Sequence, residues 1–225
     1  MDVSFNDRDN FIRNMVTISG CGRGSWSPPM RKVETGALPV DVDEILLDLR
    51  VDDPDDEEAT VERLARGACA FIERRTGFVL LPTVYEITLS DWFAGAALEV
   101  LRGPFRQVEA ISYQSARDVW TDVDPEDYWV SSGEREFTLR FLDSFTSPPL
   151  WQPQDCVRIR FSAGFDAHDE SGGMEIEDGL RTVLLMVTGH YYKNREFLGL
   201  ADQKAGAEAV EVGATSLLGM YRRFW

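Results

Sequence analysis

The sequence contains few of the residues on which nucleophilic and metal-dependent sites depend. Only three of its 225 residues are cysteine and two are histidine. Cys21, Cys69 and Cys156 are odd in number and far apart, which excludes a disulfide framework and a zinc site of paired thiols. We interpret Cys69 and Cys156 as buried thiols, because one lies among the apolar positions of a predicted helix and the other opens a predicted strand. His168 and His190 leave little material for a Ser/His/Asp or Cys/His site.

The motifs of common catalytic and nucleotide-binding sites are also missing. The sequence has no GxSxG, HExxH or GxxxxGK[ST] segment. Glycines alternate at Gly20, Gly22 and Gly24, but Ser-Pro-Pro at 27–29 follows them, so no helix can begin there to hold a phosphate. We interpret this stretch as a flexible loop. The sequence therefore predicts a protein that is not an enzyme, with no metal site and no cofactor.

Long apolar runs are absent as well. A membrane-spanning helix needs roughly 20 apolar residues, and no stretch of the chain approaches that length. Residues 1–11 lack the basic-then-apolar order of a signal peptide. We expect a protein that is made in the cytoplasm and has no membrane partner.

Positive charge is scarce relative to negative charge. The chain has 39 acidic and 23 basic residues, which gives a formal net charge of −16. A surface with this much negative charge repels phosphate backbones. The charge therefore argues against a protein that recognises nucleic-acid sequence. The negative charge does not exclude a protein that lies close to DNA and must not bind it.

The strongest helix signal covers residues 54–76. Asp53 can cap the first turn, and Pro54 suits the first helical position because its missing N–H is not needed there. The acids at 55–58 favour the positive end of the helix dipole. Apolar residues then recur at helical spacing, and Gly77 can supply a left-handed exit.

Three further helices are expected. Asp41 and Glu44 have the spacing of a capping box at the start of a helix over 42–51. Apolar residues at helical spacing predict a third helix over roughly 175–196 and a short last helix over 214–222.

The hydrophobic period changes from 3.6 to 2 after Leu81, which indicates strands. In the last of them, Val157–Phe161, we expect the apolar residues to be buried and the two arginines to point outward. The strand-like runs, separated by turn residues, are Val84–Leu89, Leu98–Leu101, Val108–Tyr113, Tyr128–Val130, Phe137–Phe141 and Val157–Phe161. We interpret the aromatic residues of this region as its core and rim rather than as a ligand platform; they are Trp92, Trp120, Tyr128, Trp129 and Trp151.

These elements predict an α+β fold, in which a small helical bundle carries an inserted antiparallel β-rich region at about 82–165. We expect residues 41–80 and 166–225 to form the bundle and 81–165 to form the insert. Residues 1–40 have no sustained hydrophobic period, so we expect an arm that is extended or disordered until the protein assembles.

The order of these parts resembles the head–tail connector (adaptor) proteins of long-tailed bacteriophages and gene transfer agents. The resemblance runs from about Ile45 to the C-terminus and depends on the order and spacing of several segments. They are Leu49–Asp52 before an acidic helix start, Ile72–Gly77, Leu101–Val108, Asp124–Tyr128, Phe161–Phe165, Gly189–Glu196 and Leu217–Arg222. Residues 1–40 depart from the family, whose members begin near the first helix.

The resemblance implies a structural virion protein. Such proteins form a ring, usually of twelve copies, beneath the portal at the neck of the particle. The ring extends the DNA channel and offers a platform for the stopper or tail-terminator protein. The implied partners are therefore other copies of the chain, the portal above, the stopper or tail below, and packaged double-stranded DNA without sequence-specific contact.

Two sets of residues are candidates for assembly. Residues 221–225 combine cations and aromatics, which are enriched in interface hot spots, and the resemblance implies that the chain end docks on the portal. The portal-docking set is Leu217, Leu218, Tyr221, Arg222, Arg223, Phe224 and Trp225. The set expected to face the channel or a neighbouring subunit is Asp52, Asp53, Asp55, Asp56, Glu57, His190 and Arg195. Solvent-facing acids and a chain end packed on its own bundle are the alternatives.

Two other interpretations stay open. Carboxylates at Asp166, Asp169, Glu170, Glu175 and Glu177 could serve an acidic enzyme, although they crowd one predicted loop and helix start instead of flanking a cleft. The loop also lacks the calcium-binding spacing. The second alternative is another neck or tail-completion protein of the virion.

Overall fold

The computed structural model describes residues 16–19, 27–34, 37–93, 95–133, 135–152, 154–166, 174–194, 213–219 and 221. The chain divides into two compact units. The first, which we call the β unit, comprises Met1–Thr35 and Thr83–Gly164. The second, the helical unit, comprises Gly36–Pro82 and Phe165–Trp225.

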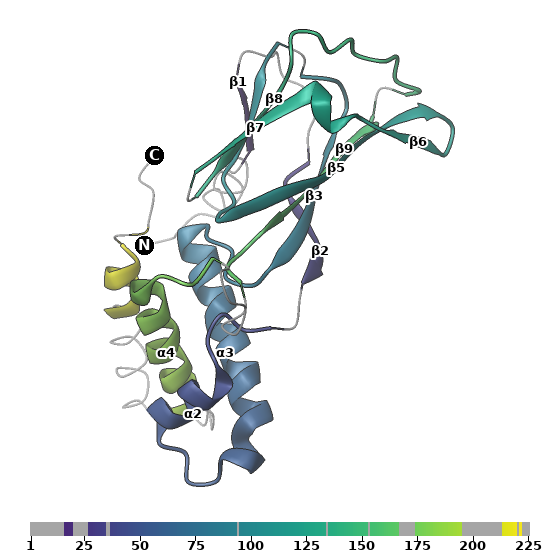
Figure 1. The fold of residues 1–225 in the computed structure, drawn as a ribbon. Coiled ribbons are helices and arrows are strands. Elements are labelled where there is room, and N and C mark those ends of the chain that lie inside the picture. Colours follow the sequence, from purple (N-terminus) through teal and green to yellow (C-terminus); the bar gives the residue numbers. More distant parts are fainter. Residues whose placement is uncertain are drawn as a thin grey trace, which may run out of the picture. The chain divides into compact units, whose positions relative to one another are not determined.

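The β unit contains two antiparallel sheets (Figure 1). The four-stranded sheet has the order β1-β4-β8-β7 and the five-stranded sheet has the order β2-β3-β9-β5-β6. The strands are β1 (Val16–Ser19), β2 (Met30–Glu34), β3 (Thr83–Leu89), β4 (Ala97–Val100), β5 (Phe105–Ala116), β6 (Val119–Asp122), β7 (Tyr128–Ser132), β8 (Phe137–Phe141) and β9 (Val157–Ala163). A short 3-10 helix, η1 (Pro125–Asp127), precedes β7.

The core of the β unit is built by alternate residues of its strands. In β9, Val157, Ile159 and Phe161 are fully buried, whereas the arginines between them are more exposed, as the alternation predicts. The ring of Phe137 on β8 lies 4.8 Å from the ring of Phe161 and 4.4 Å from that of Phe105 on β5, measured between centroids. These contacts join the inner faces of the two sheets into one apolar layer.

The helical unit consists of α2 (Val42–Leu49), α3 (Pro54–Thr76), α4 (Asp178–Lys193) and a short helix over 213–218. Their apolar faces share one core, whose fully buried members include Val61, Ala65, Ile72, Leu180, Val183, Leu184 and Ala214. Helices and sheets together confirm the α+β class. Among the described residues, no helix is both long and apolar enough to cross a membrane.

The helix ends follow the sequence signals in part. Pro54 is the first residue of α3, and Gly77 ends that helix with a φ of 79°, as predicted. Asp41 caps α2 by accepting a hydrogen bond from the Asp43 amide at 3.1 Å. The capping box is wrong in its second half, because the Glu44 carboxylate accepts hydrogen bonds from the Arg181 guanidinium on α4. A tertiary ion pair has taken the place of the local contact.

Three strands lie where no strand was expected. β1 and β2 fall within residues 1–40, and β6 forms a hairpin with the long strand β5. β2 escaped detection because all five of its residues are exposed, so no buried face leaves a period-2 pattern. In the β5–β6 turn, Asp118 takes a φ of 59°, a left-handed conformation that Asp tolerates. Most of residues 1–40 lies outside the described residues, and the predicted arm stays a prediction.

Candidate assembly surfaces

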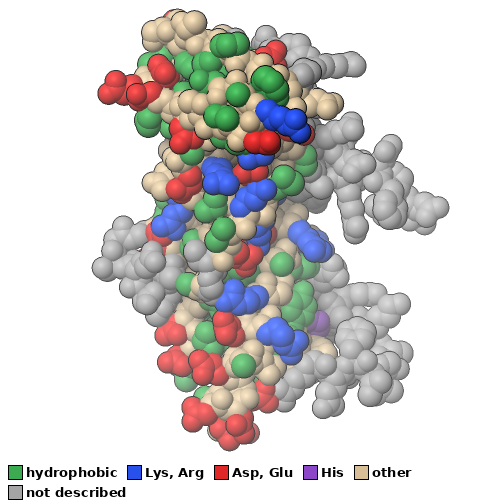
Figure 2. Space-filling model, turned by 90° about the vertical axis from the view of Figure 1, so that its right-hand side faces the viewer, with side chains coloured by type: hydrophobic (Ala, Val, Ile, Leu, Met, Phe, Trp, Pro, Cys, Tyr) green, Lys and Arg blue, Asp and Glu red, His purple; other side chains and the backbone are tan. Residues whose placement is uncertain are grey.

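The acids at the start of α3 lie on the surface of the helical unit. Asp52, Asp53, Asp55 and Asp56 are exposed, and Glu57 is half-buried. Figure 2 shows acidic side chains gathered at the lower end of the helical unit in that view. Asp55 and Asp56 have no ion-pair partner among the described residues. The acidic start of α3, as we call Asp52–Glu58, therefore carries a concentrated negative charge.

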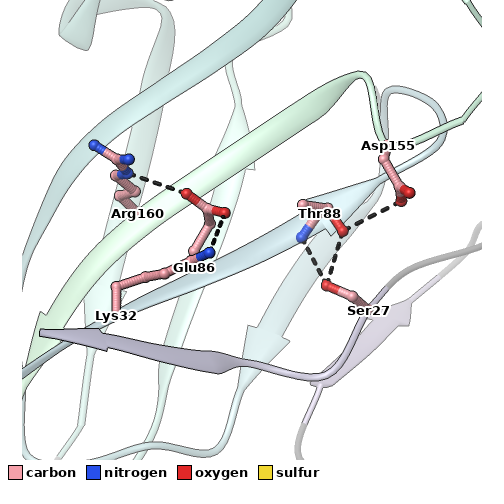
Figure 3. Close-up of polar contacts among 6 residues, drawn as sticks. All are labelled: Ser27, Lys32, Glu86, Thr88, Asp155 and Arg160. Carbon is pink, nitrogen blue, oxygen red and sulfur yellow. Dashed lines mark hydrogen bonds and ion pairs between the residues drawn. The ribbon is translucent and has the colours of Figure 1, made fainter.

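On the β unit, a buried carboxylate holds two cations at a positively charged surface. The side chain of Glu86 on β3 is only 6% exposed, yet it ion-pairs with Lys32 Nζ at 3.0 Å and with Arg160 Nε at 3.1 Å (Figure 3). Burial by itself raises the pKa of Glu86. The hydrogen bonds from Lys32 and Arg160 outweigh burial, so the pKa lies below the usual carboxyl value. The carboxylate therefore stays charged and anchors two cations on the face of the sheet that points away from the core.

Arg158 is a third cation on this face. It lies two residues before Arg160 on β9, and its charge also lowers the pKa of Glu86. Its guanidinium carbon stands 3.6 Å from the centre of the Trp120 ring on β6. This stacking fixes the plane of the guanidinium. We call Lys32, Arg158 and Arg160 the basic patch.

The sequence did not single out the basic patch. Glu86 alternates with the buried Tyr85 and Ile87, so the pattern assigns it to the exposed face of an ordinary strand. The available signal was that an acid on β3 and two arginines on β9 both point away from the core. Recognising their contact required the pairing of β3 with β9, in which Glu86 lies opposite Arg160.

The predicted portal-docking set divides into buried and exposed parts. Leu218 is 2% exposed and belongs to the core of the helical unit, whereas Leu217 is 38% exposed. The ring of Tyr221 packs edge-on against Phe78, with 6.1 Å between ring centroids. Its hydroxyl fills the place where any residue larger than Gly179 would put its Cβ atom. Arg222, Arg223, Phe224 and Trp225 lie outside the described residues.

The third helix supplies the remaining candidates. His190 lies in the last turn of α4, and its Nδ1 is 3.0 Å from the amide nitrogen of Asn194. The same side-chain nitrogen, Asn194 Nδ2, also donates a hydrogen bond to the His190 carbonyl at 2.8 Å. This side chain therefore helps to end α4. Arg195 lies outside the described residues. The helix itself covers Asp178–Lys193, somewhat less than the expected 175–196.

The carboxylates of the enzyme alternative that the structure describes differ in burial. Asp166 is 7% exposed and accepts a hydrogen bond from the Met174 amide, which ties together the two sides of the loop. Glu175 and Glu177 are exposed, and Asp169 and Glu170 lie outside the described residues. Among the described residues, no group of three His, Cys, Asp or Glu side chains could hold a metal ion.

The aromatic and thiol side chains separate into core and surface. Trp92 is 9% exposed and donates its indole N–H to the Pro148 carbonyl at 2.9 Å. Trp129 and Trp151 are exposed, as rim residues would be. Cys69 and Cys156 are both buried, as predicted, and burial raises the pKa of the Cys156 thiol.

The chain resembles known proteins in its fold rather than in its sequence. No protein-family model and no curated protein matches the sequence. The fold matches chains from gene transfer agent particles, and each match extends over most of both chains.

Three such matches come from solved particle structures. A chain in the neck of an empty gene transfer agent particle, computed with C6 symmetry, has a TM-score of 0.67 at 23% identity, covering 87% of this chain and 96% of that one. A chain in the virion of a native gene transfer agent particle has a TM-score of 0.64 at 22% identity, with coverages of 86% and 95%. A chain in the neck of the native particle, computed with C12 symmetry, has a TM-score of 0.59 at 20% identity, with coverages of 87% and 96%. This chain therefore shares their fold.

Proposed function

We propose that the protein is a structural component of the neck of a phage-like particle, and more specifically a head–tail connector (adaptor). In this role, copies form a ring below the portal, extend the DNA channel, and give the stopper or tail a platform. The observation that carries the proposal is the fold shared with a neck chain over 87% of this chain and 96% of that one. Because the two chains agree over nearly their whole lengths, they are better explained as the same component of the particle than as different proteins that share one small domain.

The sequence supports a role in assembly rather than in catalysis. The order of segments from Ile45 onward resembles connectors, and common catalytic motifs are missing. A ring of twelve copies fits the symmetries used for the two matched necks, since twelve copies satisfy both sixfold and twelvefold symmetry.

The negative charge suits a conduit for DNA. A net charge of −16 on each copy, repeated around a ring, would keep phosphates from binding to the wall of the channel. The genome could then pass without being held. We assign the acidic start of α3 either to this wall or to the contact with a neighbouring copy.

Docking on the portal is assigned to Leu217 and residues 222–225. Leu217 is exposed beside the buried Leu218, so it can contact a partner without unfolding its own helix. The sequence Arg-Arg-Phe-Trp at 222–225 supplies residue types that are common in hot spots. Each contact can be weak, because repetition around a ring makes attachment cooperative.

The test is a mass measurement of the purified chain with and without the portal protein of the same particle. The proposal predicts a complex with the portal that contains a ring of this chain. A chain lacking only residues 222–225 keeps Leu218 and Tyr221 in the core, so it should fold but leave the complex. A chain that binds no portal but assembles on tail components would instead favour another neck or tail-completion protein. A chain that binds neither would contradict the proposal.

A further inference from the structure

The basic patch is a positively charged site in a strongly negative protein. Lys32 and Arg160 share the single carboxylate of Glu86, and Arg158 is close enough to affect its pKa. Three cations therefore surround one anion. The side chains of Lys32 and Arg160 are 38% and 56% exposed, so the surplus positive charge is accessible.

Three other carboxylates of this sheet are held by polar side chains outside the basic patch. Asp122 on the edge strand β6 accepts a hydrogen bond from Ser112 at 2.7 Å, and Glu109 accepts one from Gln107 at 3.0 Å. Asp155, before β9, accepts one from Thr88 at 3.3 Å. None of the three is in an ion pair with a cation of the basic patch. Among the described residues, Glu86 is therefore the one carboxylate that is ion-paired with the basic patch, and the patch keeps its positive surplus.

Arg158 is the member of the patch best prepared for a partner. It is half-buried, and its guanidinium is stacked on Trp120. It forms no ion pair and no hydrogen bond with any described residue, and its Nε is a buried donor without an acceptor there. A stacked guanidinium presents its N–H groups in one plane, which is the geometry that a carboxylate binds.

A closed ring of identical subunits imposes a condition that this patch meets. Its contacts are head-to-tail, so two different surfaces of the chain must meet at each junction. Copies that each carry a charge of −16 repel one another unless the junction brings opposite charges together. Asp55 and Asp56 provide exposed acids that have no ion-pair partner in the part of the chain that the structure describes, and the basic patch provides the complementary cations.

We propose that the basic patch of one copy binds the acidic start of α3 in the neighbouring copy. This inference rests on the proposed ring and names the contact that closes it. A second copy fits the patch better than DNA does, because a surplus of about two charges gives a duplex little affinity at physiological salt. The remainder of the chain repels DNA.

A charge-exchange experiment on the full-length chain tests the contact. Ring yield is measured by native mass spectrometry in the presence of the portal protein. We expect Arg158→Glu and the pair Asp55→Lys, Asp56→Lys each to lower ring yield about tenfold or more, and the chain with all three substitutions to recover most of it. Arg158→Gln should have a smaller effect in the same direction, without placing a carboxylate beside Glu86.

Matched controls separate the contact from net charge and from unfolding. Arg140→Glu makes the same charge change as Arg158→Glu on a different exposed arginine, and the pair Glu99→Lys, Asp143→Lys matches the acid-to-lysine change. These controls should assemble like the wild type. Circular dichroism melting checks that every variant is folded.

The outcomes are distinct. If Arg158→Glu assembles as well as Arg140→Glu, or if the three combined substitutions fail to recover the ring, the inference is overturned while the proposed ring stands. If the wild type binds duplex DNA in a fluorescence titration and Arg158→Gln does not, the patch is a DNA contact and the inference is overturned. If the wild type forms no ring with the portal, the proposed function fails and the inference falls with it.

Discussion

At the residue scale, Glu86 is a buried charge of the β unit. It is an acid in the middle of a sheet, and it is tolerated there because two cations hydrogen-bond to it. Those cations are partly exposed, so each can be rehydrated if the carboxylate is removed. The energy at stake is therefore that of charged hydrogen bonds rather than that of two buried, unpaired ions.

We predict that Glu86→Gln lowers the free energy of unfolding by about 1–3 kcal/mol at pH 7. Because the folded-state pKa of Glu86 is lowered, its contribution is present above the unfolded carboxyl pKa and is lost as pH falls through the folded value. The gap between wild type and variant should therefore be constant near neutral pH and shrink below about pH 4. Urea unfolding between pH 7 and pH 3 measures this gap.

Glu99→Gln is the control for this prediction, because Glu99 is exposed on β4. It should change stability by less than about 0.5 kcal/mol. A Glu86→Gln chain as stable as the wild type at neutral pH would show that the ion pairs do not support the sheet.

At the element scale, the sequence predicted elements that bury one clear face. The 54–76 helix is confirmed at both ends because Pro54 and Gly77 act through local backbone geometry. β2 was missed because a wholly exposed edge strand has no apolar face, so only pairing with β3 defines it. Glu44 shows the same limit, since its partner Arg181 is 137 positions away in the sequence.

The assembly residues were less predictable than the elements. The sequence grouped Leu217 and Leu218 as one docking motif, whereas the helix turns Leu218 into the core and leaves Leu217 exposed. The contact of Tyr221 with Phe78 and Gly179 likewise depends on tertiary packing. Local pattern gives helical spacing, but it does not tell which face a six-residue helix buries.

Leu217 and Leu218 therefore offer a matched pair of substitutions in one short helix. Leu218→Ala should lower the free energy of unfolding by about 2–4 kcal/mol, because it removes buried methyl groups and leaves a cavity. Leu217→Ala should leave thermal stability nearly unchanged and weaken binding to the portal. Thermal melting and portal co-purification measure the two effects, and a Leu217→Ala chain that binds like the wild type would remove Leu217 from the docking surface.

At the scale of the whole molecule, a strongly acidic chain of two compact units is proposed to close into a ring around DNA. Like charge on every copy of such a ring would keep phosphates away, but it would also oppose the association of the copies. The contact proposed for the basic patch would resolve this conflict, since it would act at the junction without changing the sign of the rest of the surface.

Cryo-electron microscopy of particles that carry this chain would show where it lies. If the protein is a connector, its density forms a closed ring at the neck, immediately below the portal, around a central channel. Density for the chain in the capsid shell, the tail tube or the tail tip, or its absence from the particle, would show that the protein is not a connector.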